Sequence, residues 1–393
     1  MNNLIKELQR RTPLGWLQLS HHKSRLVVAL AGIAFADVLM FMQLGFQNAL
    51  YDSNTTINRA VLADIILISP QSRNMQNMST FSRRRLLQAA DVPGVQSATA
   101  MYIGLVTWKH PQTRRKTPVQ AIGITPEQPV LDLPELNAQL DKIKLPDSFI
   151  FDRGARGDYQ EVFRQIDAGK TVSTEIDKRT INITGAFKLG ASFGADGTLI
   201  SSDENFLRLF PRRQAGSISL GLIDIQPGYD SQQVAAALKL HLQNNEDVKV
   251  LTREEFIKLE EAFWKSESPI GFIFSLGVSM GFLVGVIIVY QVLSTDVNAH
   301  LKEYATFKAI GYPNSYLLGV IFEEAIILAF LGFIPGFVVP LGLYHLARNA
   351  TNLPIYMTLF RAVVVLLLTI IMCAISGIIA TQKLQSADPA DMF

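Results

Sequence analysis

The sequence has 393 residues, of which 49% are hydrophobic and only 18% are charged, and its formal net charge is +2. Soluble domains carry about 25% charged residues. The deficit here is concentrated in four long apolar stretches, and the rest of the sequence has an ordinary globular composition. This distribution excludes a fully soluble enzyme, a disordered protein and a pure membrane bundle. The small net charge gives no field that would favour nucleic acid, and the single cysteine, Cys373, excludes an intrachain disulfide and a cysteine-cluster metal site.

The first 25 residues are basic and amphipathic. Leu4, Ile5 and Leu8 fall on one face of a helix, and Trp16 stands shortly before the first apolar stretch. This pattern predicts a helix in the headgroup layer on the cytoplasmic side of a membrane, with a solvated basic tail as the alternative.

Four apolar stretches are each long enough to cross about 30 Å of hydrocarbon as a helix. They predict transmembrane helices at 26–50, 270–293, 317–346 and 362–380. The third stretch is interrupted by Pro335 and Pro340. The first is too long for the apolar part of a signal peptide, and no small-residue cleavage site follows it.

Basic residues in the short loops set the predicted orientation. They are Lys302 and Lys308 between the second and third stretches, Lys383 in the tail, and Arg348 with Arg361 between the third and fourth, in addition to the basic start. By the positive-inside rule, both termini, including the tail 381–393, and the segment 294–316 face the cytoplasm, and 347–361 forms a short periplasmic loop. The stretch 51–268 then forms one large external domain.

The external stretch alternates between strand and helix patterns. Strands are predicted at 63–69, 95–108 (one or two strands), 116–124, 180–189, 198–201, 217–226 and 247–251, and helices at 82–90 and 231–242. The two helices are each followed by a similar strand start, which suggests two related α+β parts flanking a strand-rich part at about 125–215. Four prolines make 125–150 a poor candidate for regular structure.

Carboxylates occur within the apolar stretches. Asp37 lies midway along the first, where a charge is unfavourable by about 2.5–3.5 kcal/mol. It is interpreted as a coupling or lipid-headgroup contact or, preferably, as part of an interhelical hydrogen bond with Gln43 or Gln291. Glu323 and Glu324 begin near the inner end of the third stretch and are expected to reach the headgroups or the preceding cytoplasmic helix.

Glycines recur at every fourth position in the second and third apolar stretches. They are Gly277, Gly281, Gly285, Gly332 and Gly336. Small residues at this spacing let helix backbones approach closely, so we expect tight packing within one chain or across a dimer. The alternative is that glycine is simply common in membrane helices.

No motif predicts catalysis in this chain. Residues 167–171 end in Gly-Lys-Thr, but Arg164 stands where a phosphate-binding loop has its first glycine, so a turn before a strand at Val172 is predicted. No histidine pairs with a carboxylate at metal-ligand spacing, and no serine lies in a nucleophile elbow. We therefore expect no catalytic residue, no metal and no cofactor in this chain.

The segment 294–316 has the pattern of a short amphipathic helix on the cytoplasmic side. Asp296 is a candidate N-cap, Val297 and Tyr304 belong to an apolar stripe, and Gly311 followed by Pro313 ends the helix. A helix of this kind between two membrane spans is suited to docking in a groove of another protein.

Residues 302–311, KEYATFKAIG, resemble a stretch of the FtsX-like permeases, the membrane subunits of MacB-type ABC systems. The predicted order of elements and the Asp-Pro of the tail agree with that family. Blocks at 26–44, 189–197, 268–275 and the SADPAD tail resemble most the cyanobacterial DevC family, the permeases of heterocyst glycolipid exporters. The likeness spans essentially the whole chain.

This resemblance implies a homodimer that works with two copies of a separate ABC ATPase, which holds ATP and Mg²⁺. It implies ATPase-coupling residues at Lys302, Glu303, Tyr304, Lys308, Ala309, Ile310 and Gly311, although Tyr312 and Pro313 stand where the family has a basic continuation. It also implies that the external domain holds a membrane-fusion adaptor joined to a TolC-like outer-membrane duct.

We therefore expect an α-helical membrane protein with four transmembrane helices and a large α+β periplasmic domain between the first and second. Its expected role is that of a non-catalytic permease subunit of a MacB-type (type VII) exporter in a cyanobacterial inner membrane, in contact with lipids and exporting a glycolipid or other amphiphile. In this view, ATP-driven closure of the ATPases pushes the 296–311 helix. The alternative is an FtsX-like regulatory subunit that controls a periplasmic hydrolase.

Overall fold

The computed structural model describes residues 15–16, 23–301, 303–304, 306 and 310–385. The chain forms two compact units. Residues 1–48, 272–347 and 355–393 are here called the helical unit, and residues 49–271 with 348–354 the globular unit. Most of the amphipathic helix predicted at the start, and the SADPAD tail, lie outside the described residues.

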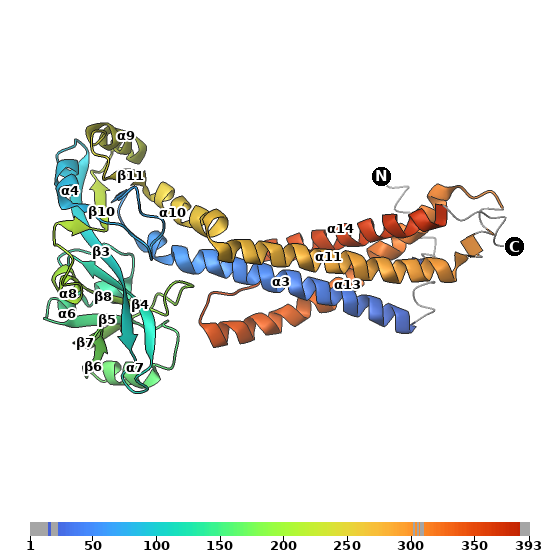
Figure 1. Ribbon diagram of the computed structural model, residues 1–393, viewed down its shortest axis with the longest axis horizontal. Coiled ribbons are helices and arrows are strands. Elements are labelled where there is room, and N and C mark those ends of the chain that lie inside the picture. The colour runs from blue at the N-terminus through green and yellow to red at the C-terminus, as the bar shows by residue number, and fades with distance from the viewer. Residues whose placement is uncertain (1–14, 17–22, 302, 305, 307–309, 386–393) are drawn as a thin grey trace. The chain divides into compact units, whose positions relative to one another are not determined.

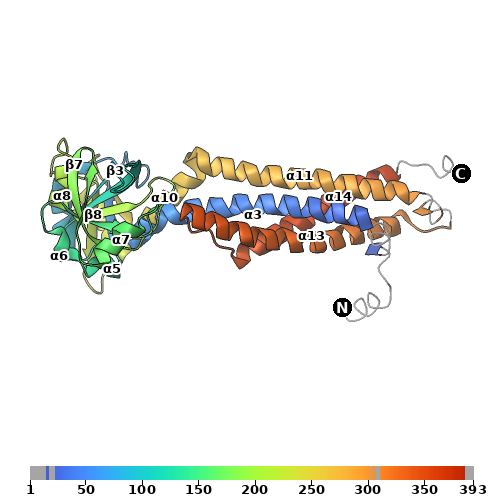
Figure 2. The ribbon, with the colours of Figure 1, turned by 90° about the horizontal axis from the view of Figure 1, so that it is seen from below.

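The helical unit is built from four helices that are long and apolar enough to cross a membrane, side by side in Figure 2. They are α3 (Lys23–Ala60), α11 (Pro269–Ala299), α13 (Asn314–Thr351) and α14 (Leu359–Gln385). They coincide with the four apolar stretches of the sequence. The third is not interrupted: α13 passes through Pro335 and Pro340, because an apolar surrounding offers the backbone no competing water.

Helix α3 continues well past the predicted end of its span. Its last turns are polar, yet they stay helical because their side chains bond to carbonyls of the preceding turn. Asn54 Nδ2 donates to Leu50 O over 2.7 Å, and Thr55 Oγ1 donates to Tyr51 O over 2.9 Å. One unbroken helix therefore begins in the helical unit and ends in the globular unit.

The core of the helical unit takes side chains from all four helices. Its fully buried members include Ile33 and Ala36 of α3, Val289 and Leu293 of α11, Ala325 and Leu328 of α13, and Met372 and Cys373 of α14. Many large apolar side chains point outward instead, as expected for helices whose surroundings are hydrocarbon.

The globular unit is organised by a nine-stranded sheet in the order β11-β1-β10-β3-β4-β8-β5-β7-β6 (Figure 1). The strands are β1 (Ile65–Ile68), β3 (Val95–Lys109), β4 (Lys116–Ile124), β5 (Ser148–Asp152), β6 (Val172–Ile176), β7 (Arg179–Phe187), β8 (Thr198–Ser202), β10 (Leu220–Ile225) and β11 (Lys249–Thr252). A separate pair joins β2 (Phe81–Ser82) to β9 (Ser217–Ile218).

One half of the sheet consists of two β-α-β segments. Helix α4 (Arg83–Ala90) lies between β1 and β3 in the chain, and α9 (Ser231–His241) lies between β10 and β11. The four strands alternate in the order β11-β1-β10-β3, all antiparallel, which is the arrangement of a ferredoxin-like fold. These segments contain the two stretches that look alike in the sequence.

The other half closes into a six-stranded ring. The second part of β3 pairs with β4, and its last two residues also pair with β6, so the strands β3-β4-β8-β5-β7-β6 return to β3. Trp108 and Phe151 stack at 4.7 Å between ring centroids and are fully buried. The strand-rich part therefore begins at Tyr102, earlier than the predicted 125–215.

Both faces of the sheet are covered, and this explains the apolar run of β1. Ile65 and Leu67 belong to one core cluster, whereas Ile66 and Ile68 belong to the other. The first cluster includes side chains of α4, α9, α7 (Gln160–Asp167) and α8 (Asp203–Leu209); the second includes side chains of α3, α5 (Pro134–Asn137), α6 (Leu140–Ile143) and α10 (Arg253–Ala262).

The prediction of little regular structure at 125–150 is wrong. This stretch contains α5, α6 and the start of β5, which is buried along its whole length. Pro134 occupies the first turn of α5, where a proline removes no helical hydrogen bond, and Pro146 precedes the strand. The prolines therefore mark the boundaries of short elements.

Candidate functional site

The predicted ATPase-coupling residues lie in the connection between α11 and α13. Lys302, Lys308 and Ala309 lie outside the described residues. Glu303 and Ile310 are exposed, the latter by 70%, whereas Tyr304 is buried. The amide of Ile310 donates to Thr306 O over 3.1 Å, and Gly311 has a φ of +101°, so a helical turn ends at this glycine.

Asp296 does not begin a separate helix as predicted. Helix α11 continues through it, because Leu293 and Val297 on either side stay packed in the bundle. The Asp296 side chain is buried, and its Oδ2 lies 3.6 Å from Nδ1 of His300, too far for a hydrogen bond.

Glu324 is fully buried, which excludes the first of its two predicted contacts, with the headgroups, and leaves the second, with the preceding cytoplasmic segment. Its two carboxyl oxygens have no hydrogen-bond partner among the described residues, and Asp296 of α11 is close enough to interact with it electrostatically. Gly15 packs closely against Glu324, since an added Cβ on Gly15 would lie 2.8 Å from Cγ of Glu324. Glu323 next to it is half-buried. The two carboxyls Asp296 and Glu324 therefore lie near each other between α11 and α13, close to the coupling connection.

Asp37 is the central polar group of the bundle. It is fully buried, and Oγ1 of Thr369 on α14 donates to its Oδ1 over 2.6 Å. The predicted interhelical hydrogen bond is present, but its partner is Thr369 and not Gln43 or Gln291. The second oxygen, Oδ2, has no partner among the residues that the structure describes.

All five glycines of the predicted packing pattern lie against α3, and Gly285 also lies against α14. At Gly277 an added Cβ would collide with the Gln43 side chain, and at Gly281 it would lie 3.3 Å from Leu39 Cβ. At Gly285 it would collide with Met372 Sδ of α14 and lie 2.9 Å from Ala36 Cβ. At Gly332 and Gly336 it would lie 2.6 Å from Ile33 Cγ2 and from Asp37 Cβ, respectively. The contacts along α11 run antiparallel to α3 and those along α13 run parallel to it. The structure thus places these glycines in intrachain contacts, with α3 as the shared partner.

The end of α3 is attached to α10 and to the π-helical turn η1 (Phe263–Glu267) that precedes α11. Arg253 Nη2 donates to Arg59 O over 2.6 Å, and Arg59 Nη2 lies 3.3 Å from Glu261 Oε1. The ammonium of Lys265 lies 5.5 Å from the ring centroid of Tyr51. The two chain segments that link the globular unit to α3 and α11 are therefore joined to each other.

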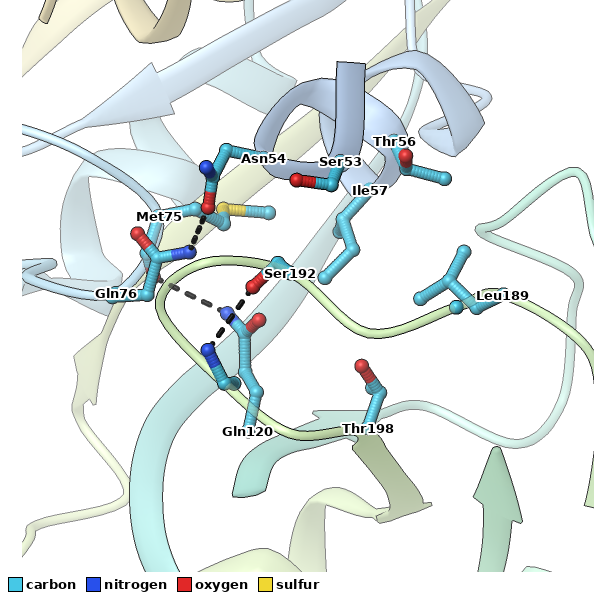
Figure 3. A pocket seen from close by; sticks show the side chains of 12 residues that line it. Ser53, Asn54, Thr56, Ile57, Met75, Gln76, Gln120, Leu189, Ser192 and Thr198 are labelled. Carbon is cyan, nitrogen blue, oxygen red and sulfur yellow. Dashed lines mark hydrogen bonds between the residues drawn. The ribbon is translucent and has the colours of Figure 1, made fainter. Parts of the chain in front are cut away.

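A buried polar network surrounds the last turns of α3, and Figure 3 shows the part of it that contains Asn54, Gln76 and Gln120. Asn54 Oδ1 accepts from Gln76 Nε2 over 3.0 Å, and Gln120 Nε2 donates to Met75 O over 3.3 Å. Glu260 of α10 accepts from the Met75 amide and from Trp264 Nε1, each over 2.8 Å. Burial raises the pKa of Glu260 to about 7 despite these donors.

The cavity in this network has a volume of about 10 Å³, room for about one water molecule. Its lining is mostly polar and comes from α3, the loop after β1, β4, β8 and the 189–195 loop. The cavity is too small for a substrate larger than water, so a structural role suits it best.

Residues 348–354, here called the strap, comprise the last turn of α13 and the start of the connection to α14, and they belong to the globular unit. Arg156 Nε donates to Thr351 O over 3.0 Å, and Asn352 Nδ2 donates to Ala155 O over 3.1 Å. Asn352 has a φ of +53°, a conformation that asparagine tolerates better than most residues, and Leu353 beside it is buried. The strap is thus attached to the 155–156 turn by two hydrogen bonds, one from the side chain of Arg156 and one from the side chain of Asn352.

The segment that the strap contacts consists of two turns, one after β5 and one after β7, which are linked through Asp152. Asp152 accepts amide protons from Gly154, Leu189 and Gly190 over 2.8–2.9 Å, and burial raises the pKa of Asp152 although these donors favour its charged form. Gly154 must be a glycine, because an added Cβ would lie 2.6 Å from the Cα of Gly190.

Arg156 connects the same two turns to the strap. Besides its bond to Thr351, it lies 2.7 Å from Asp196 Oδ1 through Nη1 and donates to Ser192 O over 3.2 Å through Nη2. Nothing in the sequence pattern singles out Arg156, because its partners are distant in the chain. Only the block at 189–197, selected by its resemblance to a family, pointed to this region.

The Gly-Lys-Thr segment forms the predicted turn. Gly169 has a φ of +75°, Lys170 is exposed, and β6 begins at Val172. Among the described residues, no group of three or more histidine, cysteine, aspartate or glutamate side chains gathers as a metal site would require. The features that stand out are helix packing within the helical unit and hydrogen bonds within the globular unit at the segments where the chain enters and leaves it.

Comparison with known proteins gives a match for the second part of the chain. Residues 275–389 match the family described as FtsX-like permease C-terminal. This part of the chain is similar to the C-terminal domain of FtsX-like permeases. The matched range includes nearly all of α11, α13 and α14 and every predicted coupling residue. No curated protein matches the chain at a significant level.

Solved structures are similar to the chain over about half its length. One is the periplasmic region of MacB from Actinobacillus actinomycetemcomitans, with 14% identity, 50% of this chain and 92% of that chain covered, and a TM-score of 0.31. Another is the extracellular domain of the noncanonic ABC-type transporter YknZ from Gram-positive bacteria, with 15% identity, 48% and 99% covered, and a TM-score of 0.32.

Proposed function

We propose that this protein is the membrane permease subunit of an ABC system whose energy comes from a separate ATPase. The observation that carries the proposal is the match of residues 275–389 to the FtsX-like permease C-terminal family, since this range contains the coupling segment. Four helices long enough to cross a membrane, with a large globular unit inserted after the first, support an inner-membrane protein whose globular unit is periplasmic and whose termini are cytoplasmic.

In this proposal, two copies of the ATPase bind two copies of this chain at residues 302–311, and ATP and Mg²⁺ are held by the ATPase. The exposed side chain of Ile310 offers an apolar contact beside the charged Glu303, a combination suited to a groove on another protein. The helical turn ends at Gly311, directly after Ile310.

The packing of the bundle supports a transmission role. A push on the coupling segment acts on α11 and α13, and both pack through glycines against α3. Three covalent connections then reach the globular unit: α3 itself, the η1 turn before α11, and the strap. Since close-packed helices move as rigid bodies, displacement of the helices changes the load on all three connections.

We propose that the globular unit holds a membrane-fusion adaptor joined to a TolC-like outer-membrane duct, and that the system exports a glycolipid or other amphiphile as DevC-like permeases do. The water-sized cavity beside Asn54 cannot hold cargo of that size. The cargo would therefore pass through the adaptor and not through this cavity. The regulatory alternative shares the coupling segment, and it replaces the adaptor with a periplasmic hydrolase.

The test is stimulation of the partner ATPase by the permease reconstituted in lipid nanodiscs. Ile310→Asp should abolish most of the stimulation while leaving membrane insertion and folding intact. Leu240→Asp is the matched control, because Leu240 is an aliphatic residue of the globular unit with 66% exposure, close to the 70% of Ile310. Equal stimulation by both variants would refute docking at this segment. The proteins that copurify with the permease then distinguish the two functions: a membrane-fusion adaptor favours export, and a periplasmic hydrolase favours regulation.

A further inference from the structure

Two pairs of arginines that are far apart in the sequence lie close together on the surface of the globular unit. Arg83 and Arg84 begin α4, and Arg212 and Arg213 stand shortly before β9. The pairing of β2 with β9 brings the two segments together, and the Arg83 amide extends it with a hydrogen bond of 2.7 Å to Gly216 O. These four arginines are here called the arginine patch.

Arg213 is held in place by uncharged groups. Its Nη1 donates to Ile103 O over 2.7 Å, and its Nε donates to Ser217 O over 3.4 Å. Its guanidinium carbon lies 5.3 Å from the ring centroid of Phe206 and 5.8 Å from that of Tyr102. Burial lowers the pKa of Arg213, because no described carboxylate forms a salt bridge with it that would offset the loss of water. An anion from outside would therefore stabilise this half-buried positive charge.

The other three arginines of the patch are exposed, and none of them forms a salt bridge within the described part of the chain. Arg85, the next residue of α4, shows the contrast, since its Nε lies 2.8 Å from Asp247 Oδ1. The first turn of α4 contains no acidic residue, so Arg83 and Arg84 stand at the positive end of the helix dipole, where cations are unfavourable. The stability of α4 therefore does not explain their position.

The carboxylates near the patch do not neutralise it. Asp203 of α8 interacts electrostatically with Arg83 without forming a salt bridge, and Glu127 and Glu204 in turn act on Asp203. Even with all three of these carboxylates counted against its four guanidinium groups, the patch keeps an excess of positive charge.

The turn that links the second pair of arginines to β9 adds further donors. Gln214, Ala215 and Gly216 are exposed, and their three amides donate to no other group that the structure describes. Unpaired amides next to guanidinium groups are suited to bind the oxygens of an anion. This surface thus offers both positive charge and hydrogen-bond donors to one kind of ligand, a group that carries oxyanions.

An exposed leucine indicates that the ligand belongs to a protein. Leu87 is 64% exposed and follows Arg83 by four residues and Arg84 by three, so it lies on the same face of α4. Arginine is enriched at protein interfaces, where its planar guanidinium pairs with a carboxylate through two hydrogen bonds. A free phosphate would leave Leu87 in water, whereas a protein surface that is both acidic and apolar would cover it.

We propose that the arginine patch and Leu87 together bind an acidic segment of a partner protein. Carboxylates of the segment pair with the exposed arginines and with the amides of the 214–216 turn, and an apolar side chain of the segment covers Leu87. The same patch of a second copy of this chain does not fit, because it would bring arginines against arginines. The site belongs to the globular unit alone, so it is independent of the function proposed above.

The experiment uses the full-length protein in nanodiscs of zwitterionic lipid and two fluorescent peptides. One peptide is rich in glutamate with interspersed leucines, and the other has glutamine in place of every glutamate. The acidic peptide should bind at least tenfold more tightly than the neutral one, and its affinity should fall as the salt concentration rises. Arg84→Glu with Arg212→Glu should lower that affinity at least tenfold, and Leu87→Ser should lower it by a smaller factor.

The control is Lys116→Glu with Lys170→Glu, which makes the same change in net charge at exposed residues on other elements of the globular unit. This variant should bind the acidic peptide nearly as well as the wild type. If the reversal of charge at Arg84 and Arg212 lowers the melting temperature, Arg84→Gln with Arg212→Gln replaces it and should cause a smaller loss of affinity in the same direction.

Three results would overturn the proposal. Equal affinity for the two peptides would exclude recognition of carboxylates. Unchanged binding in the arginine variants, or an equal loss in the lysine variant, would show that the patch is not the binding site. Flotation with phosphatidylglycerol vesicles that depends on Arg84 and Arg212, combined with peptide binding that Leu87→Ser leaves unchanged, would assign the patch to an anionic lipid surface instead. None of these results depends on stimulation of an ATPase.

Discussion

Replacement of Arg156 by alanine should release the strap without unfolding the globular unit. The substitution removes the hydrogen bond to Thr351 O and the contacts with Asp196 and Ser192, and it keeps the Asn352 bond to Ala155. A hydrogen bond from a charged donor contributes about 1.5–3 kcal/mol, and the low end applies because the Arg156 side chain is 35% exposed. A loss of about 1.5–2 kcal/mol in local stability corresponds to roughly ten- to thirtyfold faster opening.

Hydrogen exchange measured by mass spectrometry on peptides that cover 348–356 is the assay. The matched control is Arg153→Ala, because Arg153 is also 35% exposed and lies three residues away, but it pairs with Asp167 and stacks on Phe163 instead of contacting the strap. Faster exchange of the strap in the Arg156 variant alone is the expected outcome. Equal exchange in the two variants would refute the reasoning that Arg156 holds the strap.

Three further predictions concern the interior of the two units. The pKa of Glu260 is raised from 4.5 to about 7, so its contribution to stability is fully present below pH 4.5 and is lost as the pH rises through 7. Thermal melts at a series of pH values should show that the free energy of unfolding of the wild type falls by about 3 kcal/mol over this range, whereas that of Glu260→Gln does not show this fall. Parallel pH dependence in the two proteins would contradict this. Gly332→Val should lower the melting temperature in detergent, since overpacking costs about 1–3 kcal/mol, whereas Gly342→Val, with open space at its Cβ, should not; equal effects would argue against close packing on α3. Thr369→Val leaves the Asp37 carboxyl without its hydrogen-bond donor and should destabilise the solubilised protein by about 1–3 kcal/mol, and a variant as stable as wild type would show that the bond contributes nothing.

Much of the fold could be predicted from local patterns. The four apolar stretches become α3, α11, α13 and α14, and the strand predicted at 116–124 has the bounds of β4. Prediction failed where the signal depends on tertiary contacts. Strand β5 directly follows a proline-rich stretch but is buried between β8 and β7, and the polar end of α3 stays helical through side-chain bonds to its own backbone. A hydropathy pattern contains neither kind of information.

The candidate site was predictable only in part, and for a similar reason. Glycine spacing indicated close packing, but it could not identify α3 as the common partner of α11 and α13. The buried carboxyl of Asp37 required a polar contact, yet its partner Thr369 is 332 residues away in the sequence. Arg156 and the strap were missed, since an exposed-looking arginine in a polar loop carries no pattern that reveals a contact 195 residues away.

The central claim is that ATP-driven movement at the coupling segment reaches the globular unit, and hydrogen exchange of the strap in the permease–ATPase complex tests it most directly. With ATP and vanadate, peptides covering 348–356 should exchange at a different rate from those in the nucleotide-free complex, and Ile310→Asp should remove that difference while Leu240→Asp retains it. A strap whose exchange does not respond to nucleotide in the wild-type complex, or responds equally in the Ile310 variant, would contradict the account.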